Sequence, residues 1–339
     1  MRVFLNHYLL RSAFPEHKQN IGTADEIEAK QRTVTVAPRG TDEKQRTVAP
    51  QQNKKRNIGT VTPQRNEKET SVPWRRGRNR KGTNRMGRWI AFANQKGGVG
   101  KTTSAVNLAA ILGQTGYRTL LVDLDPQGSA TSGVGVAKKS LRFSVADLLI
   151  GGCRAEDAIL ATGFDHLDLL PANMSLSAAE YDLLDGEEER HSRLSAALQP
   201  LRSRYDFILF DCPPSLGMLT VNALSAADCV VIPMQCEYYA LEGLTQLSAT
   251  IERIRKRYNP RLRVAGILVT MYNGRLSLSA DVLAELKKHY GERVFETQVS
   301  RNVRLTEAPG FGQPACYYDC NAKGVKEYKK VAEELLSRL

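Results

Sequence analysis

The sequence predicts an α/β domain of the doubly wound type, in which helices cover both faces of a mostly parallel sheet. Three observations support this prediction. Short apolar segments that are typical of buried strands alternate with segments of helical periodicity from residue 88 onward. A glycine-rich turn follows the first of these strands, and two later strands end in aspartates. Because ligands bind such sheets at the carboxyl ends of the strands, a functional site is expected along that edge.

The expected elements follow one another along the chain. Strands are expected where short apolar runs occur, at residues 89–94, 119–123, 167–170, 207–211, 229–233 and 264–270. Helices are expected where apolar residues recur at helical spacing, at residues 102–114, 174–184, 190–199, 239–257, 278–290 and 322–338. The last helix has the single apolar stripe of a helix that faces a core. One doubly wound domain over residues 88–339 accounts for all of these elements.

Residues 1–87 differ from the rest of the chain in composition. The chain has 339 residues and a formal charge of +12, but residues 1–88 hold 20 basic and 8 acidic side chains, whereas residues 89–339 hold 28 of each. The polar segment has no sustained periodicity and cannot bury enough apolar surface to offset its ordering entropy, so residues 1–87 are expected to be a disordered basic extension. It is either a flexible arm that adds phosphate contacts or an inert extension, including an artefact of start-site choice with Met86 as the true start. The neutral body excludes a generic basic coat for nucleic acid.

Cysteine usage and hydropathy predict the compartment. The six cysteines are sparse and form no C-x-x-C pair, as is typical of reduced thiols. No apolar run reaches the roughly 20 residues that a membrane span needs, and the N-terminal segment lacks the features of a secretory signal. A cytoplasmic protein without a membrane anchor is therefore expected.

The segment QKGGVGKTT, residues 95–103, lies between the first strand and the first helix and predicts a phosphate-binding loop. Glycines let the backbone approach a ligand closely, and backbone N–H groups at a helix N-terminus bind anionic oxygens. Lys101 is expected to bridge the β- and γ-phosphates, and the Thr102 hydroxyl to ligate Mg²⁺. Gln95 occupies the first glycine position of the usual G-x-x-x-x-G-K-[ST] pattern, and a second lysine, Lys96, stands inside the loop. The expected phosphate-binding residues are Lys96, Gly97, Gly98, Val99, Gly100, Lys101, Thr102 and Thr103.

Aspartates at the strand ends are candidates for metal binding and catalysis. Asp211 closes an apolar strand, so its carboxylate is expected at the carboxyl edge of the sheet, where it could hold Mg²⁺ through water. Asp125 follows another strand and could orient or deprotonate the attacking water. Simpler interpretations stay open: Asp211 could cap its strand in solvent, Asp125 could only shape a turn, and Asp123 could be a structural neighbour.

Together these motifs resemble those of the ParA/MinD superfamily of ATPases. Residues 96–103 are similar to its deviant Walker A loop, DLDPQG at 123–128 to its second acidic motif, and FDCPP at 210–214 to its Walker B strand. RNVRLTEAP at 301–309 resembles a segment typical of the ParA/Soj partition branch. The resemblance covers residues 88–338. It implies a P-loop NTPase fold, ATP and Mg²⁺ as cofactors, and hydrolysis of ATP to ADP and phosphate.

The resemblance also implies roles for particular residues. It assigns Asp125 to the attacking water, and it places the adenine base near the loops that carry Met271, Asn302 and Pro309. It further implies a dimer that sandwiches two nucleotides.

The second lysine of the loop is expected to act across this dimer. A loop that already carries Lys101 gains little from a second cation in the same chain, so Lys96 is expected to reach the partner's phosphates and neutralise transition-state charge, as an arginine finger does. The alternative is a phosphate contact within the same chain. Gly97 would lie where the facing subunit approaches, so a side chain there should block dimerisation.

Two arginines are candidates for DNA binding. In the partition branch, arginines that match Arg275 and Arg304 contribute to non-specific binding of double-stranded DNA by the ATP-bound dimer, and phosphate contacts of this kind depend on salt and read no bases. The alternative is that these are solvated arginines or that Arg304 pairs with Glu307. The chain departs from the family at Asn273-Gly274, where an acidic residue and a variable one are common.

The sequence therefore predicts a ParA/Soj-type partition ATPase in the cytoplasm, associated with the nucleoid. Its Mg-ATP dimer would hold DNA, and hydrolysis stimulated by a ParB-like centromere-binding partner would release it. One alternative is an ATPase of the same fold that positions a protein complex. Another is a metabolic ligase or amidase of the related P-loop group. A MinD-type membrane-bound regulator is disfavoured, since no basic amphipathic segment follows the last helix.

Overall fold

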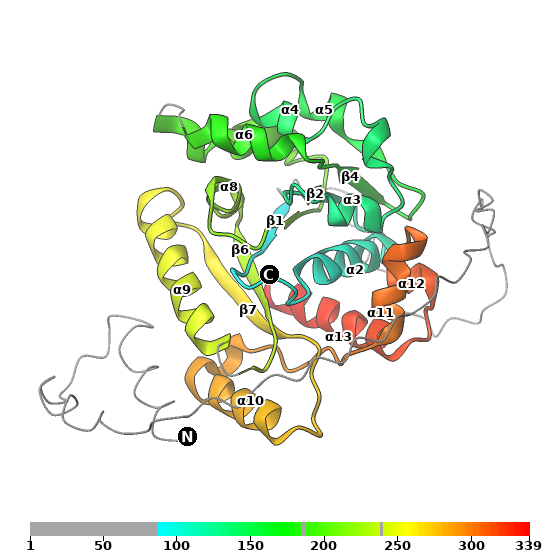
Figure 1. The fold of residues 1–339 in the computed structure, drawn as a ribbon, viewed down its shortest axis with the longest axis vertical. Helices are drawn as coiled ribbons and strands as arrows, with labels where there is room; N and C mark the ends of the chain where they lie inside the picture. Colours follow the sequence, from blue (N-terminus) through cyan, green and yellow to red (C-terminus); the bar gives the residue numbers. More distant parts are fainter. Residues whose placement is uncertain (1–86, 185–187, 238–239) are drawn as a thin grey trace, which may run out of the picture. The chain divides into compact units, whose positions relative to one another are not determined.

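The computed structural model describes residues 87–184, 188–237 and 240–339 (Figure 1). The basic extension predicted for residues 1–87 therefore lies outside the described residues except for its last position. All structural statements below concern the described part of the chain.

A seven-stranded sheet with the order β3-β4-β2-β5-β1-β6-β7 forms the centre of the fold. Neighbouring strands are parallel except β3 and β4, which run antiparallel. This arrangement confirms the predicted mostly parallel sheet. The strands are β1 Arg88–Phe92, β2 Thr119–Asp123, β3 Leu160–Ala161, β4 Leu167–Leu170, β5 Phe207–Asp211, β6 Cys229–Met234 and β7 Arg263–Val269.

Helices cover both faces of the sheet, and each face has its own hydrophobic core (Figure 1). Successive side chains of a strand point to opposite faces. In β1, Trp89 and Ala91 accordingly pack into one core with α8 and α9, while Ile90 and Phe92 pack into the other with α2 and α13. The helices are α2 Lys101–Gln114, α3 Ser129–Gly133, α4 Val145–Leu149, α5 Ala155–Ala158, α6 Ser175–Leu184, α7 Arg193–Leu198, α8 Met218–Ala226, α9 Ala240–Arg257, α10 Ser277–Tyr290, α11 Val303–Glu307, α12 Ala315–Tyr318 and α13 Lys323–Arg338.

The structure differs from the sequence prediction in the helices beside the sheet. The helix expected at 190–199 is α-helical only in α7, between two short 3₁₀ turns. Helix α8 was not predicted at all. Most of its side chains are buried, including Leu219, Asn222 and Leu224, so the sequence there has no polar face from which helical periodicity could be recognised.

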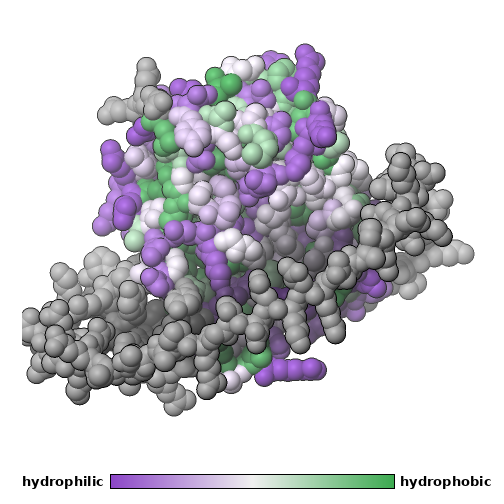
Figure 2. All heavy atoms as spheres, in the orientation of Figure 1, coloured by the Kyte–Doolittle hydropathy of each residue, from purple (hydrophilic) through white to green (hydrophobic). Residues whose placement is uncertain are grey.

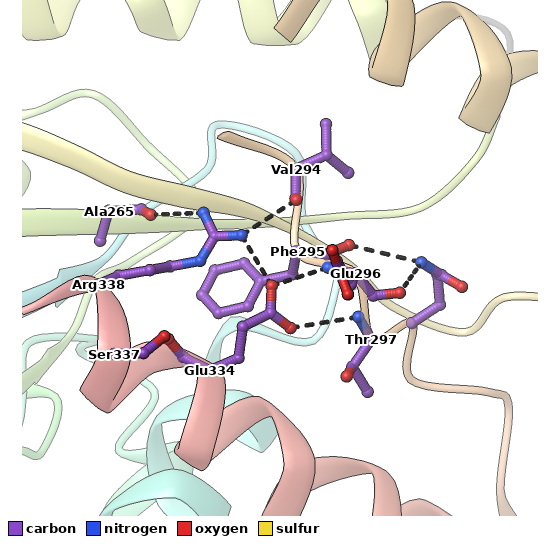
Figure 3. Close-up of polar contacts among 9 residues, drawn as sticks. Ala265, Val294, Phe295, Glu296, Thr297, Glu334, Ser337 and Arg338 are labelled. Atoms are coloured by element: carbon purple, nitrogen blue, oxygen red, sulfur yellow. Dashed lines mark hydrogen bonds and ion pairs between the residues drawn. The ribbon is translucent and has the colours of Figure 1, made fainter. Parts of the chain in front are cut away.

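The C-terminal helix α13 fixes the segment that follows α10. Glu334 accepts hydrogen bonds from the backbone N–H groups of Glu296 and Thr297 at 2.8 and 3.2 Å (Figure 3). Arg338 forms an ion pair with Glu334 at 2.7 Å and donates to the backbone oxygen of Val294 at 3.1 Å. One turn of α13 therefore holds the backbone at three positions between residues 294 and 297, beside β7.

A second contact from α13 extends this support towards the carboxyl edge of the sheet. Glu327 accepts a hydrogen bond from the backbone N–H of Ser300 at 2.8 Å. The hydroxyls of Tyr328 and Ser104 lie 2.9 Å apart, which joins α13 to the first turn of α2. The residues that follow Ser300 line the cleft described below.

Candidate nucleotide-binding site at the carboxyl edge of the sheet

A cleft of about 630 Å³ opens at the carboxyl ends of the central strands. Its walls come from loops that follow β1, β2, β5 and β7 and from the segment between β7 and α12. The phosphate-loop residues that line it are Gly97, Gly98, Gly100, Lys101, Thr102 and Thr103. Asp125, Met271, Asn302 and Pro309 also line it, so the structure brings together the predicted loop, the predicted water-orienting carboxylate and the residues expected near the base.

The loop after β1 has the backbone shape that its glycines permit. Gly98 and Gly100 have φ values of 72° and 83°, in the left-handed region that glycine adopts without strain. Gly100 is the N-cap of α2, so the helix begins directly at Lys101. The backbone N–H groups of the first turn of α2 therefore face the cleft, where an anion would be stabilised.

Neighbouring loops hold the phosphate loop in place. The Thr270 hydroxyl donates to the backbone oxygen of Val99 at 2.7 Å, and the Gln235 side-chain amide donates to the backbone oxygen of Gly98 at 2.9 Å. Thr270 follows β7 and Gln235 follows β6. The carboxyl ends of two further strands thus position the loop that follows β1.

Lys101 lies inside the curve of the loop. Its ammonium donates to the backbone oxygen of Lys96 at 3.1 Å, and the residue is only 6% exposed. Burial lowers the pKa of Lys101, and the Asp211 carboxylate is the strongest influence that opposes this shift. A phosphate group in the cleft would supply the negative charge that this buried cation lacks.

Asp211 and Asp123 end neighbouring strands and lie in register with each other. Both are fully buried, and neither carboxylate oxygen of Asp211 has a hydrogen-bond partner among the described residues. Burial raises the pKa of Asp211 well above its ordinary value, and the Asp123 carboxylate raises it further. The Thr102 hydroxyl opposes this pKa shift, although its geometry falls short of a hydrogen bond.

Asp123 has structural partners, unlike Asp211. One of its oxygens accepts from the backbone N–H and the hydroxyl of Thr131, both at 2.8 Å, and the other accepts from the backbone N–H of Asp125 at 3.1 Å. Burial raises its pKa to about 6. Asp125 is half-buried in the cleft wall and accepts from the backbone N–H of Gln127 at 2.9 Å, so it both shapes the turn and faces the cleft.

The site fits a magnesium ion. Two buried carboxylate oxygens without partners are the ligands that a hard cation prefers, and Thr102 lies beside them. Among the described residues, no group of three or more His, Cys, Asp or Glu side chains could hold a metal by itself. Such a small protein ligand set suits Mg²⁺, which usually keeps several waters and binds substrate phosphates.

The candidate DNA-binding arginines are not among the residues that line the cleft. Arg304 pairs with Glu307 at 2.8 Å and with Asp319 at 3.3 Å, so the ion pair considered as an alternative is present. Arg275 is exposed in the loop after β7, and no ion pair joins it to another described residue. Asn302 accepts from the backbone N–H of Arg304 at 3.0 Å and caps α11. Figure 2 shows hydrophilic and hydrophobic residues mixed over the visible face.

The sequence did not predict the polar contacts that hold the loop, and one of these involves Lys96. The Lys96 ammonium forms an ion pair with Glu237, which follows β6. The position of Glu237 just beyond an apolar strand is the same signal that identified Asp211. That signal was not sufficient to predict a contact with Lys96, because the sequence does not reveal that β6 lies next to β1.

Comparisons with known proteins agree with this geometry. A family model described as an AAA domain matches residues 87–264. The sporulation initiation inhibitor protein Soj of Bacillus subtilis is 48% identical over 250 residues, which cover 74% of this chain and 98% of that protein. The chromosome partitioning protein ParA of Myxococcus xanthus is 46% identical over 262 residues, which cover 77% of this chain and 92% of that protein. The chain belongs to the ParA/Soj family of partition ATPases.

A solved structure shares the ParA/Soj fold described here. It is that of cobyrinic acid a,c-diamide synthase from Mycobacterium smegmatis with a bound ATP analogue and magnesium. It is 38% identical with a TM-score of 0.65 and covers 74% of this chain and 94% of that chain.

In the described part of the chain, no helix combines the length and the apolar character that a bilayer span requires.

Proposed function

We propose that this chain hydrolyses ATP with Mg²⁺ and that hydrolysis switches an ATP-bound dimer from a DNA-binding to a DNA-free state. The observation that carries the proposal is the pair of unpartnered carboxylate oxygens of Asp211, buried beside Lys101 and Thr102 at the end of the phosphate loop. Residues 88–339 form the ATPase domain in this proposal. Family membership supports it, since relatives are named chromosome partitioning proteins.

Each residue of the site has a defined task in hydrolysis. Bound Mg²⁺ would neutralise charge on the phosphates. Lys101 and the N–H groups of the loop bind the phosphate oxygens, while Asp211 and the Thr102 hydroxyl hold the metal and its waters. Asp125, in the cleft wall, orients the attacking water or accepts its proton. Lys96 of the facing subunit neutralises the charge that develops in the transition state.

DNA binding would follow from dimerisation. Arg275 and Arg304 from two subunits supply phosphate contacts without base readout, and a ParB-like partner stimulates the hydrolysis that ends binding. Arg304 is held by Glu307 and Asp319, so DNA phosphates must compete with two carboxylates there. Arg275 has no such competitor among the described ion pairs and is the stronger candidate contact. The protein would then act on the nucleoid, in the cytoplasm.

The test of this proposal is DNA retention by the full chain with Mg-ATP, with a non-hydrolysable analogue and with ADP. Retention is expected with the two triphosphates and not with ADP. The Arg275→Glu variant should lose retention with unchanged nucleotide affinity, while Arg257→Glu, a change on the last turn of α9, should retain DNA. Equal retention with ATP and ADP, or full retention by Arg275→Glu, would contradict the proposal.

A second candidate function is ATP-dependent amidation of a carboxylic acid. The observation that favours it is the similarity to the structure described as cobyrinic acid a,c-diamide synthase. The named partition relatives are more similar to this chain, at 46% and 48% identity against 38%. ATP turnover that requires cobyrinic acid and an ammonia donor, and yields an amide, would support this candidate. Turnover that responds to DNA and a centromere-binding protein would support partition, and turnover that responds only to a protein cargo would support the positioning alternative.

A further inference from the structure

The contact between Lys96 and Glu237 concerns the lysine that the proposed function sends to the partner's phosphates. The two side chains form an ion pair within one chain, and they are 42% and 50% exposed. They come from the loops that follow β1 and β6, which are adjacent parallel strands. The strand order therefore places a carboxylate beside the loop lysine before any second subunit is present.

Hydrogen bonds join the two loops that carry this ion pair. The backbone N–H of Lys96 donates to the Asn94 side chain at 3.0 Å, and the Asn94 amide donates to the backbone oxygen of Pro233 at 2.7 Å. On the other loop, the Gln235 amide donates to Gly98 at 2.9 Å. The two loops that carry Lys96 and Glu237 are thus joined to each other by hydrogen bonds close to the ion pair.

A phosphate of the facing subunit would compete with Glu237 for the Lys96 ammonium. A lysine ammonium is a single point charge, and its transfer to a phosphate of the facing subunit separates it from the carboxylate of its own chain. We propose that Glu237 is a positioning residue that holds Lys96 on its own subunit, so that ATP-driven dimerisation has to exchange this carboxylate for the partner's phosphates. This inference rests on the proposed function, because it requires that Lys96 act across the dimer.

The ion pair should raise the nucleotide concentration that is needed for dimerisation, relative to a chain without it. A half-exposed ion pair changes an equilibrium by about two- to fivefold. A symmetric dimer breaks two such pairs, so removal of the Glu237 charge should shift the monomer–dimer equilibrium by about four- to 25-fold towards the dimer. Because the pair is partly exposed, salt should screen it and reduce this difference.

The experiment is a titration of the full chain with a non-hydrolysable ATP analogue and Mg²⁺, with dimer formation followed by sedimentation velocity. Glu237→Gln should reach half-maximal dimer formation at a lower analogue concentration than wild type, and the gap should narrow at high ionic strength. The matched control is Glu242→Gln, which removes an exposed carboxylate of α9 that has no hydrogen bond or ion pair to a described residue. This control should titrate like wild type.

Two further variants make the result specific. In a Lys96→Ala background, Glu237→Gln should not lower the analogue concentration needed for dimer formation, because the carboxylate acts through the lysine. An unchanged or higher threshold in Glu237→Gln, with wild-type thermal stability and nucleotide affinity, would overturn the inference while leaving the proposed function intact. A wild-type chain that stays monomeric with saturating analogue would overturn the proposed function and the inference with it.

Discussion

At the scale of single residues, Asp211 combines complete burial with the absence of any hydrogen-bond partner among the described residues. A buried charge without a partner destabilises a fold unless the group is neutralised or binds a cation. The raised pKa of Asp211 has the same origin, since burial and the Asp123 carboxylate both disfavour the charged form. Its neighbour Asp123 holds Thr131 and so supports the start of α3. The sequence predicted Asp211 as the metal-binding aspartate and left Asp123 open as a structural neighbour, but it could not show that Thr131 is the partner of Asp123.

Replacement of Asp211 by Asn tests the role of this carboxylate. The free energy of unfolding without nucleotide is expected to rise by about 1–3 kcal/mol, because a neutral amide of the same shape removes a buried unpaired charge. Stabilisation by Mg-ATP should disappear, and ATP turnover should fall by about 100-fold or more. Urea unfolding with and without Mg-ATP measures the first two effects, and phosphate release measures the third. A variant that is less stable without nucleotide, yet still stabilised by Mg-ATP, would exclude Asp211 as the cation ligand.

At the scale of elements, six of the seven strands and the longer helices could be predicted, whereas the two-residue strand β3 and helix α8 could not. Strands β1, β2, β5, β6 and β7 are uninterrupted apolar runs, and α13 has a clear apolar stripe. Helix α8 is buried on most sides and therefore lacks the alternation on which prediction depends. The contacts that α13 makes through Glu327, Glu334 and Arg338 also escaped prediction, since their backbone partners are distant in sequence.

The α13 contacts predict a local effect of one substitution. Glu334→Ala leaves the N–H groups of Glu296 and Thr297 without their acceptor and removes the ion-pair partner of Arg338. The free energy of unfolding is expected to fall by about 1–3 kcal/mol, and hydrogen exchange should accelerate at residues 295–298. The neighbouring exposed Glu333 provides the control, since Glu333→Ala should change neither measurement. Equal effects of the two substitutions would show that the contacts of Glu334 do not support this segment.

At the scale of the whole molecule, we propose that Mg-ATP joins two copies of the chain through the phosphate loops. The loop itself was predictable because its glycines and lysines are adjacent in sequence. Its attachment to β6 and β7, through Gln235 and Thr270, was not predictable because it depends on strand order. Gly97 lines the cleft, and among the described residues a Cβ atom there would meet only Pro214, at an ordinary contact distance of 3.8 Å. A side chain at this position is therefore compatible with the fold of one subunit.

The most direct measurement is the molecular mass of the full chain in solution with Mg²⁺ and a non-hydrolysable ATP analogue. Wild type is expected to double in mass when the analogue is added and to remain monomeric with ADP. Gly97→Val should keep wild-type thermal stability and analogue affinity yet stay monomeric, because the valine side chain would lie where the facing subunit has to come close. Lys96→Ala should form less dimer than wild type. A wild-type mass that does not change with the analogue, or a Gly97→Val variant that dimerises as wild type does, would contradict nucleotide-driven dimerisation through the phosphate loops.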